Sequence, residues 1–550
     1  MIRKKPFLFD SDSLKYFHKR IFFSIIVFVF FFGSAFYRIS YISILSYFED
    51  PSKIILKNIT RGNIYDRNGI ILAATVNSKS LYAEAHLLDN INVLSNKLEK
   101  ILKIDKEILQ KKLSSNKTFV YLKRNITPSE QQKIIDLGEI HLKFEKGKKR
   151  IYPFENSASH IVGFVNIDQD GQRGIESFFN DSLSASKDIF LSIDVNLQQS
   201  IRNNLIQTIN HYEAESGLVV VLDISNGQVL SSLSYPDFNP NNKDFNENSL
   251  INRVVQSNYE MGSTFKPLTA ANGIDYGVIN AEMVFDITKS VKGVRDHDTY
   301  KGNGLYNVEK IVVESSNIGA AQIGLKIGKN FQKDFLKKLG FFDKLDIELL
   351  ETEKPLANPN NWGKHATTRI AFGHSFSITP LHLVKAYATL ANQGYIVNPT
   401  LILNKEKELQ KNILLKKETS EYFLKLLNAV ITKTKFTGPR VKIDGYMIGG
   451  KTGTSELLNP KGGYYKDRNR TSFIGVFPMN NPRYIVYTAI KYPKKPKDSK
   501  QRMTGAVVNA PLVKEIILQM IKILNLPPYL NDSFLKADIN QFYKSDYVFL

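Results

Sequence analysis

The sequence contains no cysteine. This absence excludes disulfide bonds, thiolate metal ligands and cysteine nucleophiles, and it is compatible with an oxidising compartment without establishing one. The nine histidines form no His-Glu-x-x-His pattern, and His160 has no second histidine at ligand spacing, so we expect His160 to be structural. The sequence therefore predicts neither a metal site nor a cofactor.

Acidic residues are few compared with basic ones: 53 Asp and Glu stand against 74 Lys and Arg, which gives a formal net charge of +21. Such a charge would suit a polyanionic partner or an anionic surface. The lysines are spread along the whole chain rather than gathered in a patch, however, and no zinc-finger or RNA-recognition signature occurs. We therefore do not expect nucleic acid among the partners.

Long apolar runs are equally scarce, and the chain has only one. Residues 21–37 (IFFSIIVFVFFFGSAFY) carry no charge, and the apolar character continues to about residue 45, a length that spans a bilayer. Residues 1–20 are basic, so we expect a cytoplasmic tail there, a single transmembrane anchor at 21–45 and the rest of the chain outside. The alternative is a cleaved signal peptide, because Gly33-Ser34-Ala35 follow a short apolar core. The apolar residues beyond this point favour an uncleaved anchor.

The rest of the chain divides near residues 210–215 into two regions of different pattern. Residues 46–210 alternate short β-like and helical segments, with a mainly helical stretch at 93–131. We expect a mixed α/β, non-catalytic domain in which Glu176, lacking a paired carboxylate, joins an interdomain salt bridge. The final segment, 526–550, carries no pattern that predicts structure.

Residues 215–525 have the pattern of an α+β domain with an antiparallel sheet and helices. Asn226-Gly227 joins two β-rich runs, which is the strongest short-range signal for a β-hairpin. Helices, three strands and a last amphipathic helix are then expected in that order, at about 308–394, 447–455, 471–478, 484–490 and 511–524.

The segment from residue 259 to 267 (YEMGSTFKP) is typical of a turn that delivers a serine to the start of a helix. Gly262 permits a tight backbone, and Pro267 is tolerated in a first helical turn. Ser263 and Lys266 then share one helix face, which brings a hydroxyl within reach of an amine that can take its proton. The same Ser-x-x-Lys spacing also occurs at Ser114/Lys117, Ser184/Lys187 and Ser533/Lys536. The spacing alone therefore does not identify a nucleophile.

Two further motifs complete a set. Ser315-Ser316-Asn317 lies about 50 residues after Ser263, and Lys451-Thr452-Gly453-Thr454 lies about 135 residues after that. Each motif is weak alone, whereas all three in this order and in the expected structural settings are highly specific. The set predicts a site for acyl transfer through a serine.

Each member of the set has a chemical role. Ser263 attacks a carbonyl and becomes an acyl ester, and Lys266 accepts its proton when a neighbouring cation such as Lys451 favours the neutral amine. Ser315 relays a proton to the leaving amine, and Asn317 orients substrate amides. Lys451, Thr452 and Thr454 are expected to bind the terminal carboxylate of the substrate. Gly453 would let the substrate backbone approach the strand closely. The backbone amides of Ser263 and Thr454 are expected to donate to the oxyanion.

With these motifs the chain resembles the class B penicillin-binding proteins, and among them the division-specific peptidoglycan D,D-transpeptidases of the FtsI type. The resemblance runs from the anchor to the final helix and rests on six segments: Arg61–Gly69, Gly174–Glu176, Tyr259–Pro267, Ser315–Ala320, Phe372–Leu381 and Gly445–Ser455. Two departures occur. Met261 stands where the family usually has proline, and His374-Ser375 replaces the usual Tyr-Gly or similar pair.

The resemblance implies a serine β-lactamase-like transpeptidase domain that follows a pedestal of the penicillin-binding protein dimerisation type. It implies that Ser263 is acylated by the D-Ala-D-Ala end of a peptidoglycan stem peptide from a lipid-linked precursor, and then passes the acyl group to a neighbouring stem at the septum. β-Lactams would acylate the same serine. The implied partners are a polytopic glycosyltransferase of the FtsW type and other division proteins. The implied location is the bacterial cytoplasmic (inner) membrane, with the catalytic domain on the outer, periplasmic side.

Three alternatives stay open. An elongation-type class B transpeptidase would carry the same motifs. A membrane-anchored hydrolase of the β-lactamase kind would need a positioned water and base for rapid deacylation, and the sequence offers no residue for that role. A catalytically silent scaffold or drug sensor is disfavoured by the complete motif set.

Overall fold

The structure is a computed structural model that describes residues 11–48, 60–115, 117–242, 245–296, 304–357, 360, 362–403, 412–459, 461–496 and 501–529. The chain divides into two compact units, one ending at Thr60 and the other beginning at Arg61.

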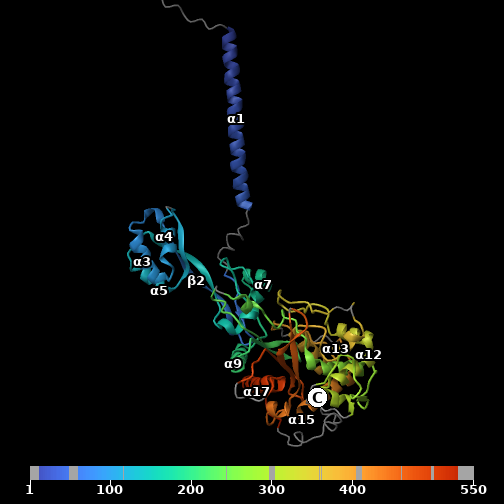
Figure 1. Cartoon of the computed structure of the whole chain (residues 1–550). Helices are drawn as coiled ribbons and strands as arrows, with labels where there is room; N and C mark the ends of the chain where they lie inside the picture. The colour runs from blue at the N-terminus through green and yellow to red at the C-terminus, as the bar shows by residue number, and fades with distance from the viewer. Residues whose placement is uncertain are drawn as a thin grey trace, which may run out of the picture. The chain divides into compact units, whose positions relative to one another are not determined.

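The first unit contains one described helix, α1 (Ser11–Phe48), which is drawn in dark blue in Figure 1. Its segment His18–Tyr41 has 24 residues and would rise about 36 Å, more than the roughly 30 Å of a bilayer's hydrocarbon core. Within the described part of the chain, it is the one helix long and apolar enough to cross a membrane. The prediction of a single apolar helix is confirmed, although the helix begins within the segment 1–20 predicted as a tail.

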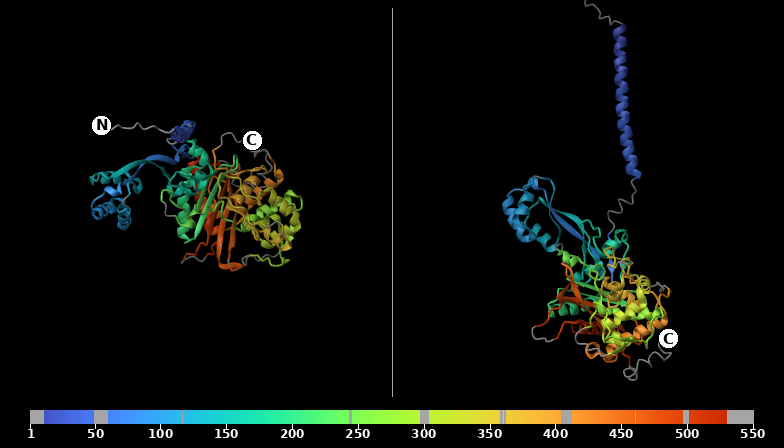
Figure 2. Two further views of the ribbon diagram at one scale, coloured as in Figure 1. Left: turned by 90° about the horizontal axis from the view of Figure 1, so that it is seen from above. Right: turned by 45° about the vertical axis from the view of Figure 1, so that its right-hand side comes forward.

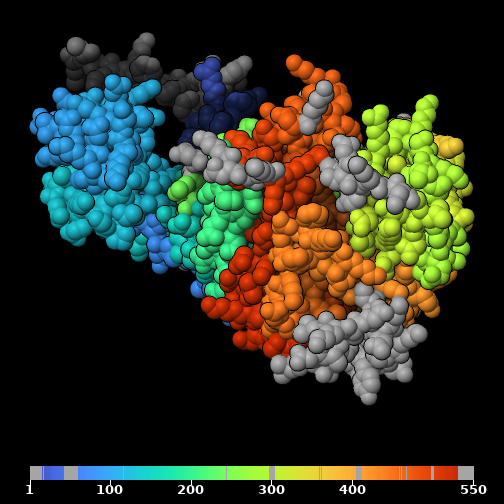
Figure 3. Space-filling model, turned by 60° about the horizontal axis from the view of Figure 1, so that its bottom comes forward, coloured from blue at the N-terminus to red at the C-terminus, as the bar shows by residue number. Residues whose placement is uncertain are grey.

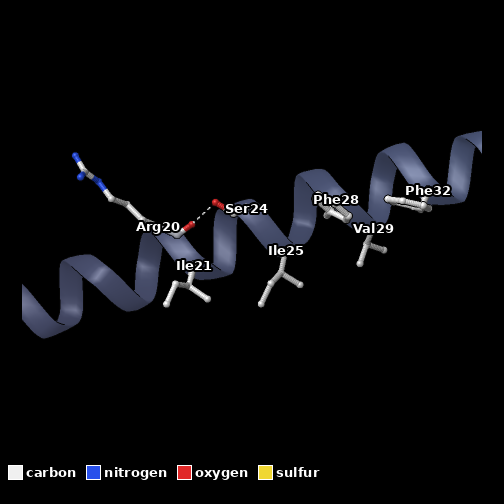
Figure 4. Close-up of a pocket in the computed structure, with 7 residues that line it drawn as sticks. All are labelled: Arg20, Ile21, Ser24, Ile25, Phe28, Val29 and Phe32. Carbon is white, nitrogen blue, oxygen red and sulfur yellow. Dashed lines mark hydrogen bonds between the residues drawn. The ribbon is translucent and has the colours of Figure 1, made fainter.

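The side chains of α1 suit an apolar surrounding. Figure 4 shows Ile21, Ile25 and Val29 along one side of the helix. Among the side chains drawn there, the hydroxyl of Ser24 donates a hydrogen bond to the backbone oxygen of Arg20 at 2.9 Å. Its donor is therefore satisfied within the helix, as an environment without water requires.

The second unit opens with a five-stranded sheet in which β3, β2, β1 and β5 are neighbours in that order and β4 pairs with β2. Three helices gather at one end of β2 in Figure 1, joined by buried leucines such as Leu81, Leu98 and Leu109. The elements of this region are β1 (Ile64–Tyr65), β2 (Ile71–Ala83), α3 (Ile91–Leu102), α4 (Lys106–Leu113), β3 (Val120–Ile126), α5 (Pro128–Ile135), β4 (Leu142–Ile151), α6 (Ser159–Val162), α7 (Gly174–Phe178), α8 (Asn180–Ser184) and β5 (Ile189–Phe190).

The stretch 93–131 is mainly helical, as expected, but residues 120–126 form the strand β3, which was not predicted. Their side chains Leu122 and Ile126 are buried while the backbone pairs with β2, so sheet pairing decided the outcome. Glu176 does not join an interdomain salt bridge: it is fully buried between Arg61 and Arg150, each 2.7 Å away and both in the same region.

The larger part of the second unit is built on another five-stranded antiparallel sheet, with strand order β10-β11-β12-β6-β7. The turn between β6 and β7 contains Gly227 with a φ of +72°, so the hairpin predicted from Asn226-Gly227 is confirmed. The strands are β6 (Ser216–Asp223), β7 (Val229–Tyr235), β10 (Gly449–Leu458), β11 (Tyr464–Phe477) and β12 (Tyr484–Lys491).

Helices cover both faces of this sheet, as Figure 2 shows. All residues of β6 are buried, and they alternate between two cores. Val219 and Val221 pack in the core that contains α9 (Val195–His211) and α17 (Gly505–Ile523), whereas Leu218 and Val220 pack in the core of the opposite face. The remaining helices are α10 (Lys266–Asp275), α11 (Val308–Val313), α12 (Asn317–Lys338), α13 (Lys364–Ile370), α14 (Pro380–Ala391), α15 (Lys417–Lys433) and α16 (Gly438–Val441).

The predicted α+β class is confirmed, since an antiparallel sheet is covered by helices that come from distant parts of the sequence. On the face drawn in Figure 3, the C-terminal part of the chain (red and orange) lies between the start of the second unit (blue to green) and residues near 310–340 (yellow-green). The last helix begins at Gly505 rather than at Pro511, so this proline lies inside the helix. Segments distant in sequence thus meet at the sheet edge formed by β10.

Candidate active site

Ser263 lies on a single 3-10 turn, η4 (Gly262–Phe265), that leads directly into α10. Gly262 has a φ of +57°, and a Cβ there would lie 3.2 Å from the carbonyl oxygen of Thr454 on β10. The turn therefore needs glycine both for its conformation and for its close approach to the sheet. Pro267 lies in the first turn of α10, where a missing N–H costs little. The structure brings Lys266 Nζ to 2.9 Å from Ser263 Oγ.

Lys266 is buried and has polar atoms on several sides. Besides Ser263 Oγ, its Nζ lies 2.5 Å from the carbonyl oxygen of Ser315, 3.1 Å from Ser315 Oγ and 2.8 Å from Asn317 Oδ1. A neutral amine has two N–H groups and one lone pair. The two carbonyl oxygens accept the two N–H groups, which leaves the lone pair for the hydroxyl of Ser263.

The electrostatics of the site favour this neutral form. Burial is the main cause that holds the pKa of Lys266 well below its ordinary value, and the charge of Lys451 lowers it further. The negative charge of Asp296 acts in the opposite direction. Burial also lowers the pKa of Lys451, to about 8. Because this pKa lies above neutral pH, Lys451 carries a positive charge there.

Ser315 connects the two lysines. Its Oγ lies 3.1 Å from Nζ of Lys266 and 3.1 Å from Nζ of Lys451. Its backbone has a φ of +60°, a left-handed conformation that costs a non-glycine residue about 1–3 kcal/mol. The surrounding contacts must compensate for this strain, and they direct the hydroxyl between the two amines.

Asp296, which the sequence pattern did not single out, supplies much of that support. Its carboxylate accepts hydrogen bonds from Ser316 Oγ at 2.6 Å, from the backbone N–H of Asn317 at 2.5 Å and from that of Ile318 at 3.0 Å. A carboxylate at the start of α12 is favourable for the helix dipole as well. No signal marked it because the contact joins a loop residue to a motif about 20 positions later, without a fixed spacing.

The residues of the third motif lie on β10, the edge strand of the sheet, as the sequence predicted. Lys451 is buried and reaches the Ser315 hydroxyl, whereas Thr452 and Thr454 are half-buried. Thr454 Oγ1 accepts a hydrogen bond from the backbone N–H of Gly505, at 3.4 Å. The strand thus presents a cation and hydroxyl groups beside the Ser263 turn.

The structure gives a reason for Gly453 that differs from the expected one. A Cβ at this position would lie 2.5 Å from Ser472 Oγ and 2.9 Å from Thr264 Cγ2. Glycine is needed here because β10 packs tightly against η4 and β11, whatever the substrate does.

Met261, a departure from the family pattern, keeps the backbone that proline would adopt, with a φ of −79°. Its side chain is buried, and its sulfur lies 3.7 Å from the hydroxyl oxygen of Tyr487, which donates a hydrogen bond to it. Its carbonyl oxygen accepts a hydrogen bond from Thr264 Oγ1 at 2.7 Å. The substitution therefore leaves the shape of the turn unchanged.

The other Ser-x-x-Lys pairs belong to other settings. Ser114 ends α4, and Ser184 Oγ accepts a hydrogen bond from the guanidinium of Arg61 at 3.1 Å. The pair Ser533/Lys536 lies outside the described residues. Among the side chains that the structure describes, no group of three or more histidine, aspartate or glutamate residues is arranged to hold a metal ion.

Comparison with known protein families decides what kind of site this is. A family model of the penicillin-binding protein transpeptidase domain matches residues 217–518, more than half of the chain. The chain belongs to the penicillin-binding protein transpeptidase family. A second model, the penicillin-binding protein dimerisation domain, matches residues 57–222. The identification as a class B penicillin-binding protein is thereby confirmed.

Individual relatives agree with the family. A protein of Caulobacter vibrioides named "Probable peptidoglycan D,D-transpeptidase FtsI" is 29% identical over 492 residues, which cover 85% of this chain and 82% of the relative. Stage V sporulation protein D of Bacillus subtilis is 26% identical over 526 residues, which cover 87% of this chain and 79% of the relative. A peptidoglycan synthetase from Bifidobacterium adolescentis shares the fold, with a TM-score of 0.66 at 20% identity, covering 85% of this chain and 96% of that one. The names of the two sequence relatives thus come from different cellular processes.

Proposed function

We propose that this penicillin-binding protein is a peptidoglycan D,D-transpeptidase that cross-links stem peptides during septal cell-wall synthesis. The observation that carries the proposal is the geometry around Lys266. Its Nζ lies 2.9 Å from Ser263 Oγ, while the carbonyl oxygens of Ser315 and Asn317, at 2.5 and 2.8 Å, can accept its two N–H groups. An amine held in this way directs its lone pair at the serine hydroxyl, which is what a general base for acyl transfer requires.

In the first half-reaction, Ser263 Oγ attacks the carbonyl carbon of the penultimate D-Ala, and its proton passes to Lys266. Lys451, with Thr452 and Thr454 beside it, binds the terminal carboxylate as a charge-assisted contact. The backbone N–H groups of Ser263 and Thr454 stabilise the oxyanion. As the C–N bond breaks, the leaving nitrogen takes a proton and D-Ala departs. Ser315 is suited to relay that proton, because its hydroxyl lies 3.1 Å from each lysine amine.

In the second half-reaction, the amine of a neighbouring stem attacks the ester carbon of the acylated Ser263. The amine loses a proton, Ser263 Oγ takes one back, and a new amide bond replaces the ester. A β-lactam would enter the same first step, since its ring amide opens at the carbon attacked by the serine. Its leaving nitrogen stays attached to the acyl group, so the serine would remain blocked.

The proposal assigns a role to each part of the chain. Residues 1–20 form a tail in the cytoplasm, and α1 anchors the protein in the cytoplasmic (inner) membrane through residues 21–45. Residues 46–210 form a pedestal for a glycosyltransferase of the FtsW type and other division proteins. Residues 215–525 catalyse cross-linking outside that membrane, and 526–550 form a C-terminal tail. The FtsI names among the relatives support the septal role.

Labelling with a fluorescent penicillin tests the proposal. We expect the full-length protein to be labelled with one adduct per chain and the Ser263→Ala variant to remain unlabelled. Absence of label on the unmodified protein would contradict the transpeptidase assignment, and turnover of many adducts per second would favour a hydrolase instead. A fluorescent fusion that lies along the lateral wall rather than at the septum would identify an elongation enzyme.

A further inference from the structure

We propose that Glu260, His374, Ser375 and Tyr464, here termed the Glu260 cluster, hold the Ser263 turn in its reactive position. The inference deepens the proposed function and rests on it, because the reaction that the cluster would affect is acylation of Ser263.

The position of the Ser263 turn is set by contacts with the loop that precedes α14. The backbone N–H of Tyr259 donates to the oxygen of Ile378 at 2.9 Å, and the N–H of Gly262 donates to the oxygen of Gly373 at 3.1 Å. A Cβ on Gly373 would lie only 2.3 Å from the oxygen of Gly262. A movement of this loop therefore moves the residue directly before the nucleophile.

One carboxylate ties this loop to two other segments. Glu260, three residues before Ser263, accepts a hydrogen bond from the backbone N–H of Ser375 at 2.8 Å, and its Oε2 lies 3.2 Å from His374 Nδ1. The hydroxyl of Tyr464, the first residue of β11, lies 3.0 Å from each carboxylate oxygen. Glu260 thus connects the nucleophile turn, the loop and the hairpin of β10 and β11. Ser375 has a φ of +64°, a strained conformation that its hydrogen bond to Glu260 helps to maintain.

The charges in the cluster fit this role. Burial alone would raise the pKa of Glu260, but the hydrogen bond and charge of His374, with the contacts from Ser375 and Tyr464, lower it overall. Burial and the negative charge of Glu260 raise the pKa of Tyr464, so its phenol stays protonated and donates. The charged groups that face Tyr464 from neighbouring elements are Arg369 on α13 and Glu456 on β10.

His374 supplies a contact to Glu260 that a substitution can remove or keep. Its side chain is 22% exposed, while the Glu260 side chain is only 8% exposed. Because the Glu260 carboxylate has little access to water, the loss of one donor would weaken the cluster. A phenol in the place of the imidazole can still donate a hydrogen bond, whereas a phenyl ring cannot.

The test measures the rate of acylation of the full-length protein by a fluorescent penicillin. We expect His374→Phe to lower the acylation rate about three-fold to ten-fold, because Glu260 loses one of its donors. His374→Tyr keeps a donor and should restore the rate to within about two-fold of that of the unmodified protein. Rescue by the variant that keeps a donor separates the role of the hydrogen bond from that of side-chain volume.

A matched control is available in the first sheet of the second unit. His141 Nδ1 lies 3.3 Å from a carboxylate oxygen of Glu84, and His141→Phe should leave the acylation rate unchanged. An unchanged rate in His374→Phe, or a loss in His374→Tyr as large as that in His374→Phe, would overturn the inference. Failure of the unmodified protein to label at all would instead overturn the proposed function, so the two failures are distinguishable.

Discussion

Two buried lysines, Lys266 and Lys451, reach the same hydroxyl in this site, and their charges compete. Acylation needs Lys266 neutral, so the rate should rise as pH increases through its lowered pKa. Binding of the substrate carboxylate needs Lys451 protonated, so the rate should fall above its pKa of about 8. We therefore expect a bell-shaped dependence of the second-order acylation rate on pH, measured with a fluorescent penicillin.

Lys451→Arg distinguishes the two limbs of this profile. Arginine stays protonated across the whole range, so the falling limb should move to higher pH while the rising limb stays near its place, even if the maximum rate is reduced. A falling limb that stays near pH 8 in this variant would show that another group is responsible.

Asp296→Asn tests whether the Asp296 carboxylate holds the Ser315-Ser316-Asn317 motif in place. The variant removes the negative charge that raises the pKa of Lys266, so the rising limb of the pH profile should shift to lower pH. It also replaces an acceptor facing the N–H of Asn317 with an amide, which should lower the maximum acylation rate about ten-fold. Asp334→Asn is the control, because that carboxylate pairs with Lys338 near the surface and should leave the profile unchanged. If the rising limb does not shift in Asp296→Asn, Asp296 affects only the geometry of the site and not the pKa of Lys266.

The sequence motifs predicted which side chains the structure brings together around Ser263, but not the residues that position them. Ser263, Lys266 and Lys451 were predicted because their chemistry depends on local turns and strands that leave short motifs. Asp296 and Glu260 act through hydrogen bonds between loops, and such contacts have no fixed spacing in the chain. Only the folded backbone brings them to the site.

At the scale of elements, strands were easiest to predict where tight turns separate them. The β6–β7 hairpin followed from Asn226-Gly227, and the strands β11 and β12 followed from their apolar runs. β3 was missed because its sequence, Val-Tyr-Leu-Lys-Arg-Asn-Ile, has no strict alternation of apolar and polar side chains, and its pairing with β2 decided the conformation. Tertiary pairing of this kind is invisible to a local pattern.

The buried ion cluster that joins β4 to α7 gives a prediction at this scale. Glu176 is fully buried and bonded at 2.7 Å to both Arg61 and Arg150. Glu176→Ala would leave two buried guanidinium groups without their carboxylate, so we expect the free energy of unfolding of this region to fall by about 3–5 kcal/mol. Thermal and urea denaturation monitored by circular dichroism would measure it. Glu84→Ala removes a partly exposed carboxylate from a pair with Lys143 and should cause a much smaller change; equal losses would contradict the argument.

At the scale of the whole molecule, the division at Thr60 separates the apolar helix α1 from the network around Ser263. The side chains described along the apolar segment of α1 are exposed, whereas the network of Ser263, Lys266, Ser315 and Lys451 lies wholly within the second unit. A protein that begins at Arg61 should therefore fold and be acylated by a fluorescent penicillin at a rate within about two-fold of the full chain, since the hydrogen bonds of this network all join residues of the second unit.

The same truncated protein should be recovered in the soluble fraction after cell lysis, while the full chain is recovered with membranes. Fusing an unrelated apolar helix of similar length to Arg61 should restore membrane recovery, because length and apolarity are what a bilayer requires. Acylation of the truncated protein that is more than about ten-fold slower would contradict the separation, because it would mean that α1 contributes to the site itself. If the helix swap restores membrane recovery but not growth of a strain depleted of the protein, the side chains of α1 would have a second role in binding a partner helix.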